Sequence, residues 1–215
     1  MDKVFGSFVK LTGYIPQKLA FRTKIYYEDK NIQNRKIKGP AIIVSNHKDV
    51  WDFATNMFTF WGRNLRCVVA DVTGHKNWFM KQFMRWLGNI VINRESMELG
   101  FIDQSVKILK DGGVLELFPE ARLPLPSEKD KELLPFTTSA AYIAYLANAK
   151  IIPVYTTGKY FKKERNRIII GTPINVGDMF DKSVDEKTNL TNITNALQEK
   201  ILKLKHELEE KTKKV

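Results

Sequence analysis

The feature that most constrains the fold of this 215-residue chain is an alternation of two kinds of apolar pattern. Short runs rich in β-branched residues alternate with longer segments in which apolar residues recur at helical spacing. The runs that we expect to form strands are Ala41–Ser45, Arg66–Ala70, Ile90–Ile92, Val114–Phe118, Ile151–Tyr155 and Arg167–Gly171. The segments that we expect to form helices are Val50–Trp61, Asn77–Leu87, Leu99–Lys110 and Thr137–Ala147. This alternation predicts an α/β fold, a single domain with a mostly parallel central sheet flanked by helices.

Both ends of the chain lie outside this alternation. In residues 1–40, the segment Val4–Arg22 mixes apolar residues with Lys and Arg, a composition typical of an amphipathic helix at a membrane interface. Near the other end, the segment Ala196–Lys214 repeats apolar residues at helical spacing, namely Leu197, Ile201, Leu204 and Leu208. We therefore expect a basic amphipathic arm at 1–40 and a domain at 41–215 that ends in an amphipathic helix.

The charge of the chain is strongly basic and unevenly distributed. Lys and Arg number 35 against 24 Asp and Glu, for a net charge of +11, and residues 1–40 hold nine of these cations against three acids. Such asymmetry indicates an anionic partner, either nucleic acid or an acidic lipid surface. A nucleic-acid-binding module would interleave basic and aromatic residues on an exposed face, whereas the strands here are apolar runs of the buried type. We therefore favour an anionic membrane surface and expect no nucleic-acid partner.

Three absences in the sequence suggest a location. No stretch reaches the roughly 18 consecutive apolar residues that cross a bilayer, and the N-terminus lacks the pattern of a signal peptide. The single cysteine, Cys67, lies in a predicted strand, so neither a disulfide framework nor a thiolate metal site is expected. The expected location is cytoplasmic, peripheral on the inner face of the membrane.

A titratable imidazole follows the first predicted strand. His47 is separated by five positions from Asp52. Imidazole titrates near neutral pH, so it can take a proton from a hydroxyl and return it, and a carboxylate on its other nitrogen would fix the tautomer. Asp52 also has a purely structural interpretation, because an acid is favoured in the first turn of a helix that begins at Val50 with Asp49 as its cap.

Charged residues follow two more of the predicted strands. Arg94 follows the third, and Glu120 and Arg122 follow the fourth. The carboxyl ends of parallel strands share one edge of a sheet, where ligands bind. A guanidinium there suits bidentate phosphate recognition, although Arg94 could equally form a surface ion pair with Glu98. The three strand ends together predict one polar pocket.

Taken in order, four segments resemble the sequence blocks of glycerolipid acyltransferases, notably 1-acylglycerol-3-phosphate acyltransferases. NHKDVWD resembles the N-H-x4-D block, GNIVINR the G-x-I-x-x-x-R block, FPEAR the F-P-E-G-T-R block and IIPV the apolar-proline block. Two places depart from the family. Ala121 alone stands where the family has Gly-Thr, and Phe136-Thr137-Thr138-Ser139 replaces Phe-Lys-x-Gly. Both departures leave open the position of Arg122 and the identity of the acceptor.

The resemblance implies an acyltransferase. Its reaction would move a fatty acyl group from a thioester of coenzyme A or acyl carrier protein to the free hydroxyl of a lysophospholipid, with 1-acylglycerol 3-phosphate as the expected acceptor and phosphatidate as the product. It implies catalytic roles for His47 and Asp52 and substrate binding by Arg94, Glu120 and Arg122. No cofactor or metal is expected besides the acyl donor as co-substrate.

Other functions stay open at this point. A different lysolipid or glycolipid could be the acceptor, and a thioesterase, with water as acceptor, is chemically close. A metallohydrolase is less favoured, because no second histidine stands at ligand spacing from His47, and neither a G-x-S-x-G elbow nor a phosphate-binding P-loop occurs.

Overall fold

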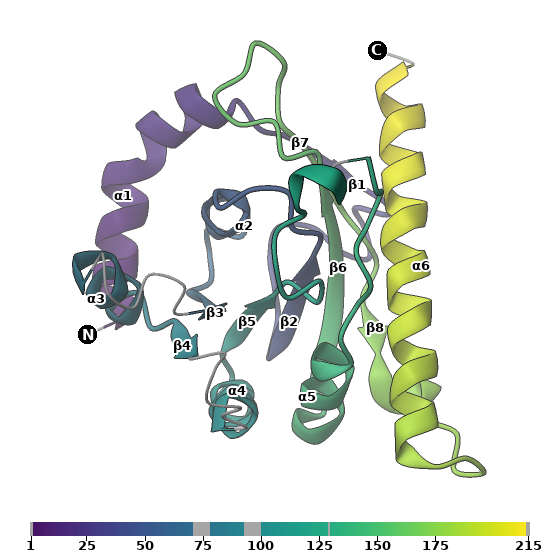
Figure 1. Cartoon of the computed structure of the whole chain (residues 1–215). Helices are drawn as coiled ribbons and strands as arrows, with labels where there is room; N and C mark the ends of the chain where they lie inside the picture. The colour runs from purple at the N-terminus through teal and green to yellow at the C-terminus, as the bar shows by residue number, and fades with distance from the viewer. Residues whose placement is uncertain (1, 71–77, 93–99, 129, 214–215) are drawn as a thin grey trace.

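The computed structural model describes residues 2–70, 78–92, 100–128 and 130–213 (Figure 1). Its strands are β1 (Lys24–Tyr27), β2 (Ala41–Ser45), β3 (Leu65–Ala70), β4 (Ile90–Ile92), β5 (Val114–Leu117), β6 (Lys150–Thr156), β7 (Arg167–Ile170) and β8 (Ile174–Asn175). Its α-helices are α1 (Asp2–Phe21), α2 (Asp52–Thr59), α3 (Trp78–Trp86), α4 (Gly100–Lys110), α5 (Ser139–Ala147) and α6 (Glu186–Lys213). Two short 3-10 helices are η2 (Pro126–Glu128) and η3 (Val176–Met179).

The strands form one sheet in the order β1-β7-β6-β2-β5-β3-β4, with β8 paired to the first residues of β6. Strands β6, β2, β5, β3 and β4 run parallel to one another. Strand β7 is antiparallel to β6, and β1 runs parallel to β7. The predicted α/β fold with a mostly parallel sheet is confirmed. Because β2, β5 and β6 are parallel neighbours, their carboxyl ends lie side by side at one edge of the sheet.

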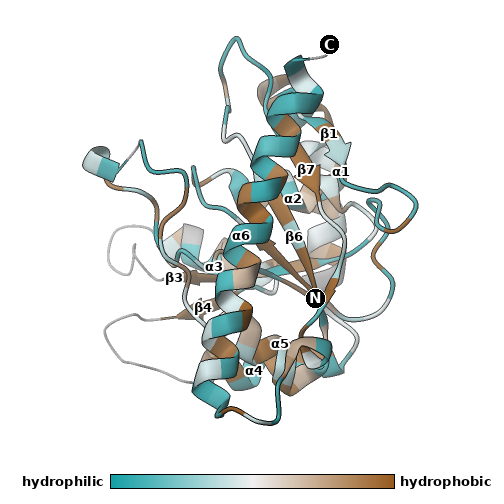
Figure 2. Ribbon diagram, turned by 90° about the vertical axis from the view of Figure 1, so that its right-hand side faces the viewer, coloured by the Kyte–Doolittle hydropathy of each residue, from teal (hydrophilic) through white to brown (hydrophobic). Residues whose placement is uncertain are grey.

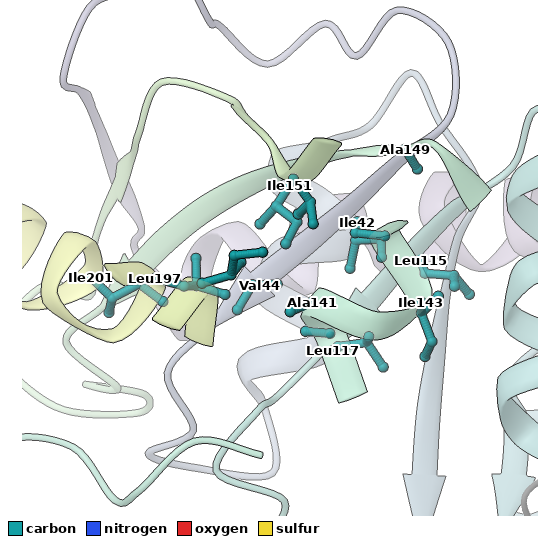
Figure 3. Packing of buried hydrophobic residues seen from close by; sticks show 14 of the residues in the cluster. Ile42, Val44, Leu115, Leu117, Ala141, Ile143, Ala149, Ile151, Leu197 and Ile201 are labelled. Atoms are coloured by element: carbon teal, nitrogen blue, oxygen red, sulfur yellow. The ribbon is translucent and has the colours of Figure 1, made fainter. Parts of the chain in front are cut away.

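Both faces of the central strands are buried, which explains their unbroken apolar runs. Ile42 lies beside Leu115 and Ile151 in register, and all three belong to one cluster that also holds buried residues of α4, α5 and α6. Figure 3 shows them with labelled residues of α5 and α6. The next residue of β2, Ile43, points to the opposite face, where it joins Phe60 in a second cluster. Helices α1, α2 and α3 share a third apolar cluster, beside β3 and the end of β5. The two sets of helices therefore hold the sheet between them.

The C-terminal amphipathic helix is longer than its sequence pattern predicted. Helix α6 begins at Glu186, ten residues before the predicted start, because Asp185 caps it by accepting hydrogen bonds from the backbone and hydroxyl of Thr188. The predicted stripe is buried as expected, and it extends toward the helix start. Its buried members are Leu190, Ile193, Leu197, Ile201, Leu204 and Leu208. Figure 2 shows this stripe as brown segments between hydrophilic turns.

Two features differ from the sequence expectations. Strand β1 was not predicted, and it lies within residues 1–40, yet it belongs to the main sheet through its pairing with β7. Helix α2 begins at Asp52 rather than Val50. The backbone N–H of Asp52 donates to the carbonyl of Asp49, and the N–H of Trp51 donates to the side chain of Asp49. This turn replaces the expected first helical turn. The predicted boundary between arm and domain at residue 40 stays a prediction.

Candidate active site

A buried amide fixes the chain just before the histidine. Asn46 follows β2 directly, and its side-chain Nδ2 donates to the carbonyl of Thr156 at 3.0 Å. Its Oδ1 accepts from the backbone N–H of Thr156 at 2.8 Å. The two bonds join the ends of β2 and β6 beyond their regular ladder. Asn46 is the first residue of the NHKDVWD segment, and the sequence analysis predicts no role for it.

His47 and Asp52 meet as the sequence predicted. The ring atom Nδ1 of His47 lies 3.1 Å from Oδ2 of Asp52. The same oxygen accepts backbone N–H bonds from Lys48 at 2.7 Å and Asp49 at 2.8 Å. Asp52 is fully buried at the start of α2, where the helix dipole favours an anion, and about 19% of the His47 side chain is exposed. The carboxylate is therefore held rigidly, while the ring stays reachable from solvent.

Tyr160 completes the hydrogen bonds of the buried carboxylate. Its hydroxyl donates to Oδ1 of Asp52 at 2.5 Å, so both oxygens of Asp52 are bonded. Tyr160 is buried in the loop between β6 and β7, and burial and the charge of Asp52 raise its pKa well above the ordinary value of 10.0. The phenol is thus a permanent donor. No sequence signal indicated this residue, because 108 positions separate it from Asp52.

The FPEAR segment holds the histidine from the other side. The ring of Phe118 stacks on the ring of His47, with centroids 4.2 Å apart and planes 19° from parallel. Glu120 is buried, and its Oε1 accepts the backbone N–H of His47 at 2.8 Å. Its Oε2 accepts the N–H of Leu134 at 2.8 Å. Burial raises the pKa of Glu120 against the opposing effect of these bonds. Glu120 therefore ties the ends of β2 and β5 together, while its expected role in substrate binding stays a prediction.

A third buried carboxyl, that of Glu116, lies close enough to Asp52 to be affected by its charge. Glu116 in β5 accepts a hydrogen bond from Nδ2 of Asn56 at 2.7 Å. Burial, together with the nearby charge of Asp52, raises its pKa well above the ordinary value. The burial of Glu116 therefore favours its uncharged form. The sequence signal for this residue is a glutamate inside an otherwise apolar strand.

The structure describes only one of the two arginines that were predicted to bind substrate. Arg94 lies outside the described residues. Arg122 is half exposed and forms a bidentate ion pair with Glu128, at 2.6 Å and 3.0 Å. Ala121 before it has a φ of +59°, a left-handed conformation that costs a residue with a Cβ about 1–2 kcal/mol. The shortened loop therefore turns at Ala121 in a conformation that glycine would adopt at lower cost. Within the described ranges, no group of three or more His, Cys, Asp or Glu side chains is placed to hold a metal ion.

The fold is an α/β sheet that carries, at the end of β2, an imidazole bonded to a buried carboxylate, an arrangement that can act as a general base. The family model described as Acyltransferase matches residues 24–157, which include His47, Asp52 and Glu120. The chain therefore belongs to the acyltransferase family, and the resemblance seen in the four sequence blocks is confirmed. Tyr160 lies three positions beyond the matched range.

Two proteins of known name are similar to this chain. It is 25% identical over 140 residues to a 1-acyl-sn-glycerol-3-phosphate acyltransferase of Bacillus subtilis (strain 168), over 63% of this chain and 66% of the relative, just under two thirds of that relative's length. Its fold is similar to the crystal structure of the 1-acyl-sn-glycerophosphate (LPA) acyltransferase PlsC from Thermotoga maritima. The TM-score is 0.62 at 17% sequence identity, and the match covers 97% of this chain and 79% of the other.

Proposed function

We propose that this protein transfers a fatty acyl group from an acyl thioester to the free hydroxyl of 1-acylglycerol 3-phosphate, which yields phosphatidate. The observation that carries the proposal is the hydrogen bond between His47 and Asp52 at the carboxyl end of β2, with Glu120 bound to the same turn. Membership of the acyltransferase family and the activity named for the Bacillus subtilis relative support it. Coenzyme A and acyl carrier protein are both proposed as donor carriers.

In the proposed mechanism, His47 acts as a general base and then as a general acid. Its Nε2, the nitrogen not bonded to Asp52, removes the proton of the acceptor hydroxyl as the oxygen attacks the thioester carbonyl. The new C–O bond forms, the C–S bond breaks, and the imidazolium returns the proton to the departing thiolate. Asp52 keeps Nδ1 protonated and stabilises the imidazolium. The base contributes about 10²- to 10⁴-fold, and positioning and oxyanion donors supply the rest.

The acceptor is proposed to be bound through its phosphate by Arg94 and Arg122. Purified protein should therefore acylate 1-acylglycerol 3-phosphate faster than lysolipids that lack a phosphate monoester. Thiol release and the lipid product are followed together over a panel of such acceptors. Thiol release without a lipid product would indicate a thioesterase, and a preference for a phosphate-free or sugar-bearing acceptor would favour another specificity within the family.

The surface formed by α1 and α3 is proposed to bind an anionic membrane on its cytoplasmic side. The two helices lie side by side, as Figure 1 shows, joined by the rings of Phe5 and Phe83 at 5.6 Å. Outward from this contact, large apolar side chains are exposed on both helices. They include Val4, Phe8, Leu11, Ile15 and Leu19 on α1 and Trp78, Phe79 and Trp86 on α3. Among the described residues, no helix has the length and apolarity to cross a membrane.

One basic residue of the predicted arm has a different role. Lys10 is buried, and its Nζ donates to the carbonyls of Trp61, at 3.1 Å, and Arg63. Burial lowers its pKa to about 8. Lys10 therefore anchors α1 to the chain that follows α2 and does not face lipid. The proposed surface charge on these helices comes instead from side chains such as Lys18 and Arg85.

Vesicle flotation tests this surface. Wild-type protein should float with vesicles that contain anionic lipid, and less with neutral vesicles or at high salt, because each Lys or Arg near the surface contributes about 1 kcal/mol. The double variant Leu11→Asp/Ile15→Asp should lose flotation, whereas Ile32→Asp, at an exposed apolar residue outside both helices, should not. Binding that ignores lipid charge, salt and the double variant would contradict the proposal.

A further inference from the structure

The loop between β6 and β7 exposes an aromatic ring among cations. Residues 157–166 hold four cations against one acid, namely Lys159, Lys162, Lys163 and Arg165 against Glu164. Phe161 lies in the middle of this loop with 63% of its surface exposed. Its φ is +54°, a left-handed conformation that is unfavourable for a residue with a Cβ, so neither burial nor backbone preference explains a phenylalanine here. Aromatic rings together with Lys and Arg are typical of segments that enter the interface of an anionic bilayer.

This loop is bonded to the end of α1, the helix that is proposed to face the membrane. The backbone N–H of Phe161 donates to the carbonyl of Ala20 at 3.2 Å, and Nη1 of Arg22 donates to the carbonyl of Lys163 at 3.2 Å. Figure 1 shows the loop beside the last turns of α1. The exposed apolar side chains of α1 end at Leu19, one residue before these contacts. The loop therefore continues the exposed apolar surface of α1 beyond the end of the helix.

The same loop lies against the turn that carries His47. Gly158 approaches Lys48 so closely that an added Cβ would lie 2.5 Å from the Cβ of Lys48. The ring centroid of Phe161 lies 5.4 Å from that of Trp51, four residues after the histidine, and Trp51 is 44% exposed. Two exposed aromatic rings, one from each segment, therefore lie together next to the candidate active site.

We propose that Phe161 and Trp51, with the cations of the loop 157–166, enter the interface of an anionic bilayer and form a membrane contact in addition to the surface of α1 and α3. The inference rests on the proposed function, because the lysolipid acceptor of that reaction resides in a bilayer. Rings inserted at this place hold His47 near the depth of the lipid head groups, where the free hydroxyl of the acceptor lies. The exposed cations of the loop attract the anionic surface, and they are Lys162, Lys163 and Arg165.

Lipid titration tests this contact without enzymatic activity. Phe161→Asp should bind vesicles of phosphatidylcholine and phosphatidylglycerol about tenfold more weakly than wild type, because a phenylalanine taken out of water contributes at least that factor. Phe161→Leu, which keeps an apolar side chain, should bind nearly as wild type does. Ile32→Asp is the matched control, because Ile32 is also 63% exposed but lies beyond the end of β1 that points away from this loop. If Phe161→Asp binds like wild type while Leu11→Asp/Ile15→Asp does not bind, the loop contact is overturned and the surface of α1 and α3 stands.

A second measurement places residue 161 relative to the lipid. Cys67 is the only cysteine of the chain and is buried, so the thiol introduced by Phe161→Cys can be labelled selectively with an environment-sensitive fluorophore. Its emission should rise on the anionic vesicles and be quenched by brominated lipid, whereas the same label on Ile32→Cys should respond to neither. Wild type treated with the fluorophore checks that Cys67 does not react. Emission at residue 161 that ignores the lipid overturns the contact, even if Phe161→Asp weakens binding.

Kinetics separate this contact from the proposed reaction. Phe161→Asp should raise KM for 1-acylglycerol 3-phosphate on vesicles about tenfold, and much less for a water-soluble short-chain acceptor. An equal rise for both acceptors overturns the role of the loop in lipid contact. A rise confined to an acyl-carrier-protein donor also overturns it and assigns the cations to a protein partner. Absence of all acyl transfer in wild type would refute the proposed function, and the titration and the labelling would still decide the contact.

Discussion

His47→Ala should lower kcat by about 10²- to 10⁴-fold while the protein stays folded. The ring supplies the only proposed proton acceptor for the attacking hydroxyl, so its removal takes away general-base catalysis. The fold should survive, because Asp52 keeps its bonds to the N–H groups of Lys48 and Asp49 and to the hydroxyl of Tyr160. Steady-state kinetics with a thioester donor and a lysolipid acceptor measure the loss, and circular dichroism and thermal unfolding report the fold.

A matched control exists for this variant. His206 lies on α6 with 60% of its side chain exposed, and its described charged partner is Glu132, at 3.9 Å. His206→Ala should keep both kcat and the melting temperature of the wild type. If His47→Ala retained wild-type kcat, His47 would not be the base and the proposed mechanism would be wrong.

Asp52→Asn should have the second largest effect, with kcat lowered by up to about 10⁴-fold and little change in KM for the acceptor. The amide keeps the size of the side chain but carries no charge, so it neither enforces the proton on Nδ1 nor stabilises the imidazolium. Hydrogen bonds to a charged group contribute about 1.5–3 kcal/mol each, so the free energy of unfolding should also fall. Kinetics over a range of acceptor concentration and urea unfolding separate the two effects.

Tyr160→Phe is the matched comparison for Asp52→Asn. It removes one donor to Oδ1 but leaves the carboxylate charge and its bond to His47 in place. Its loss of kcat should therefore be much smaller than that of Asp52→Asn. Equal losses in the two variants would show that the position of the carboxylate, and not its charge, controls the histidine.

The parts of the fold that were predictable from sequence are those in which one local pattern decides the structure. Strands β2 and β4 have the predicted bounds, because β-branched runs between turn residues have few alternatives. Strand β1 was missed because its sequence, Lys-Ile-Tyr-Tyr, has no alternating or continuous apolar pattern and is a strand through its pairing with β7. The start of α6 was missed because its first turns are polar, although Asp185 was a visible cap.

The same distinction applies to the site. The contact between His47 and Asp52 spans five positions and one turn, so their spacing could suggest it, although spacing alone left a purely structural role for Asp52 open. The bonds of Asn46 to Thr156 and of Tyr160 to Asp52 join residues 110 and 108 positions apart. They depend on β6 lying beside β2, an order that periodicity does not determine. The pairing of Arg122 with Glu128 likewise depends on a loop conformation, with Ala121 at positive φ, that its composition disfavours.

The central claim is that the acyl group passes directly from thioester to acceptor with His47 as the general base, and its most direct test is a rapid-mixing measurement of thiol release from the acyl thioester, with and without 1-acylglycerol 3-phosphate. Wild-type protein should release thiol only when the acceptor is present, in step with phosphatidate, and His47→Ala should release almost none. A burst of thiol equal to the enzyme concentration without acceptor, or release that His47→Ala preserves, would contradict the account.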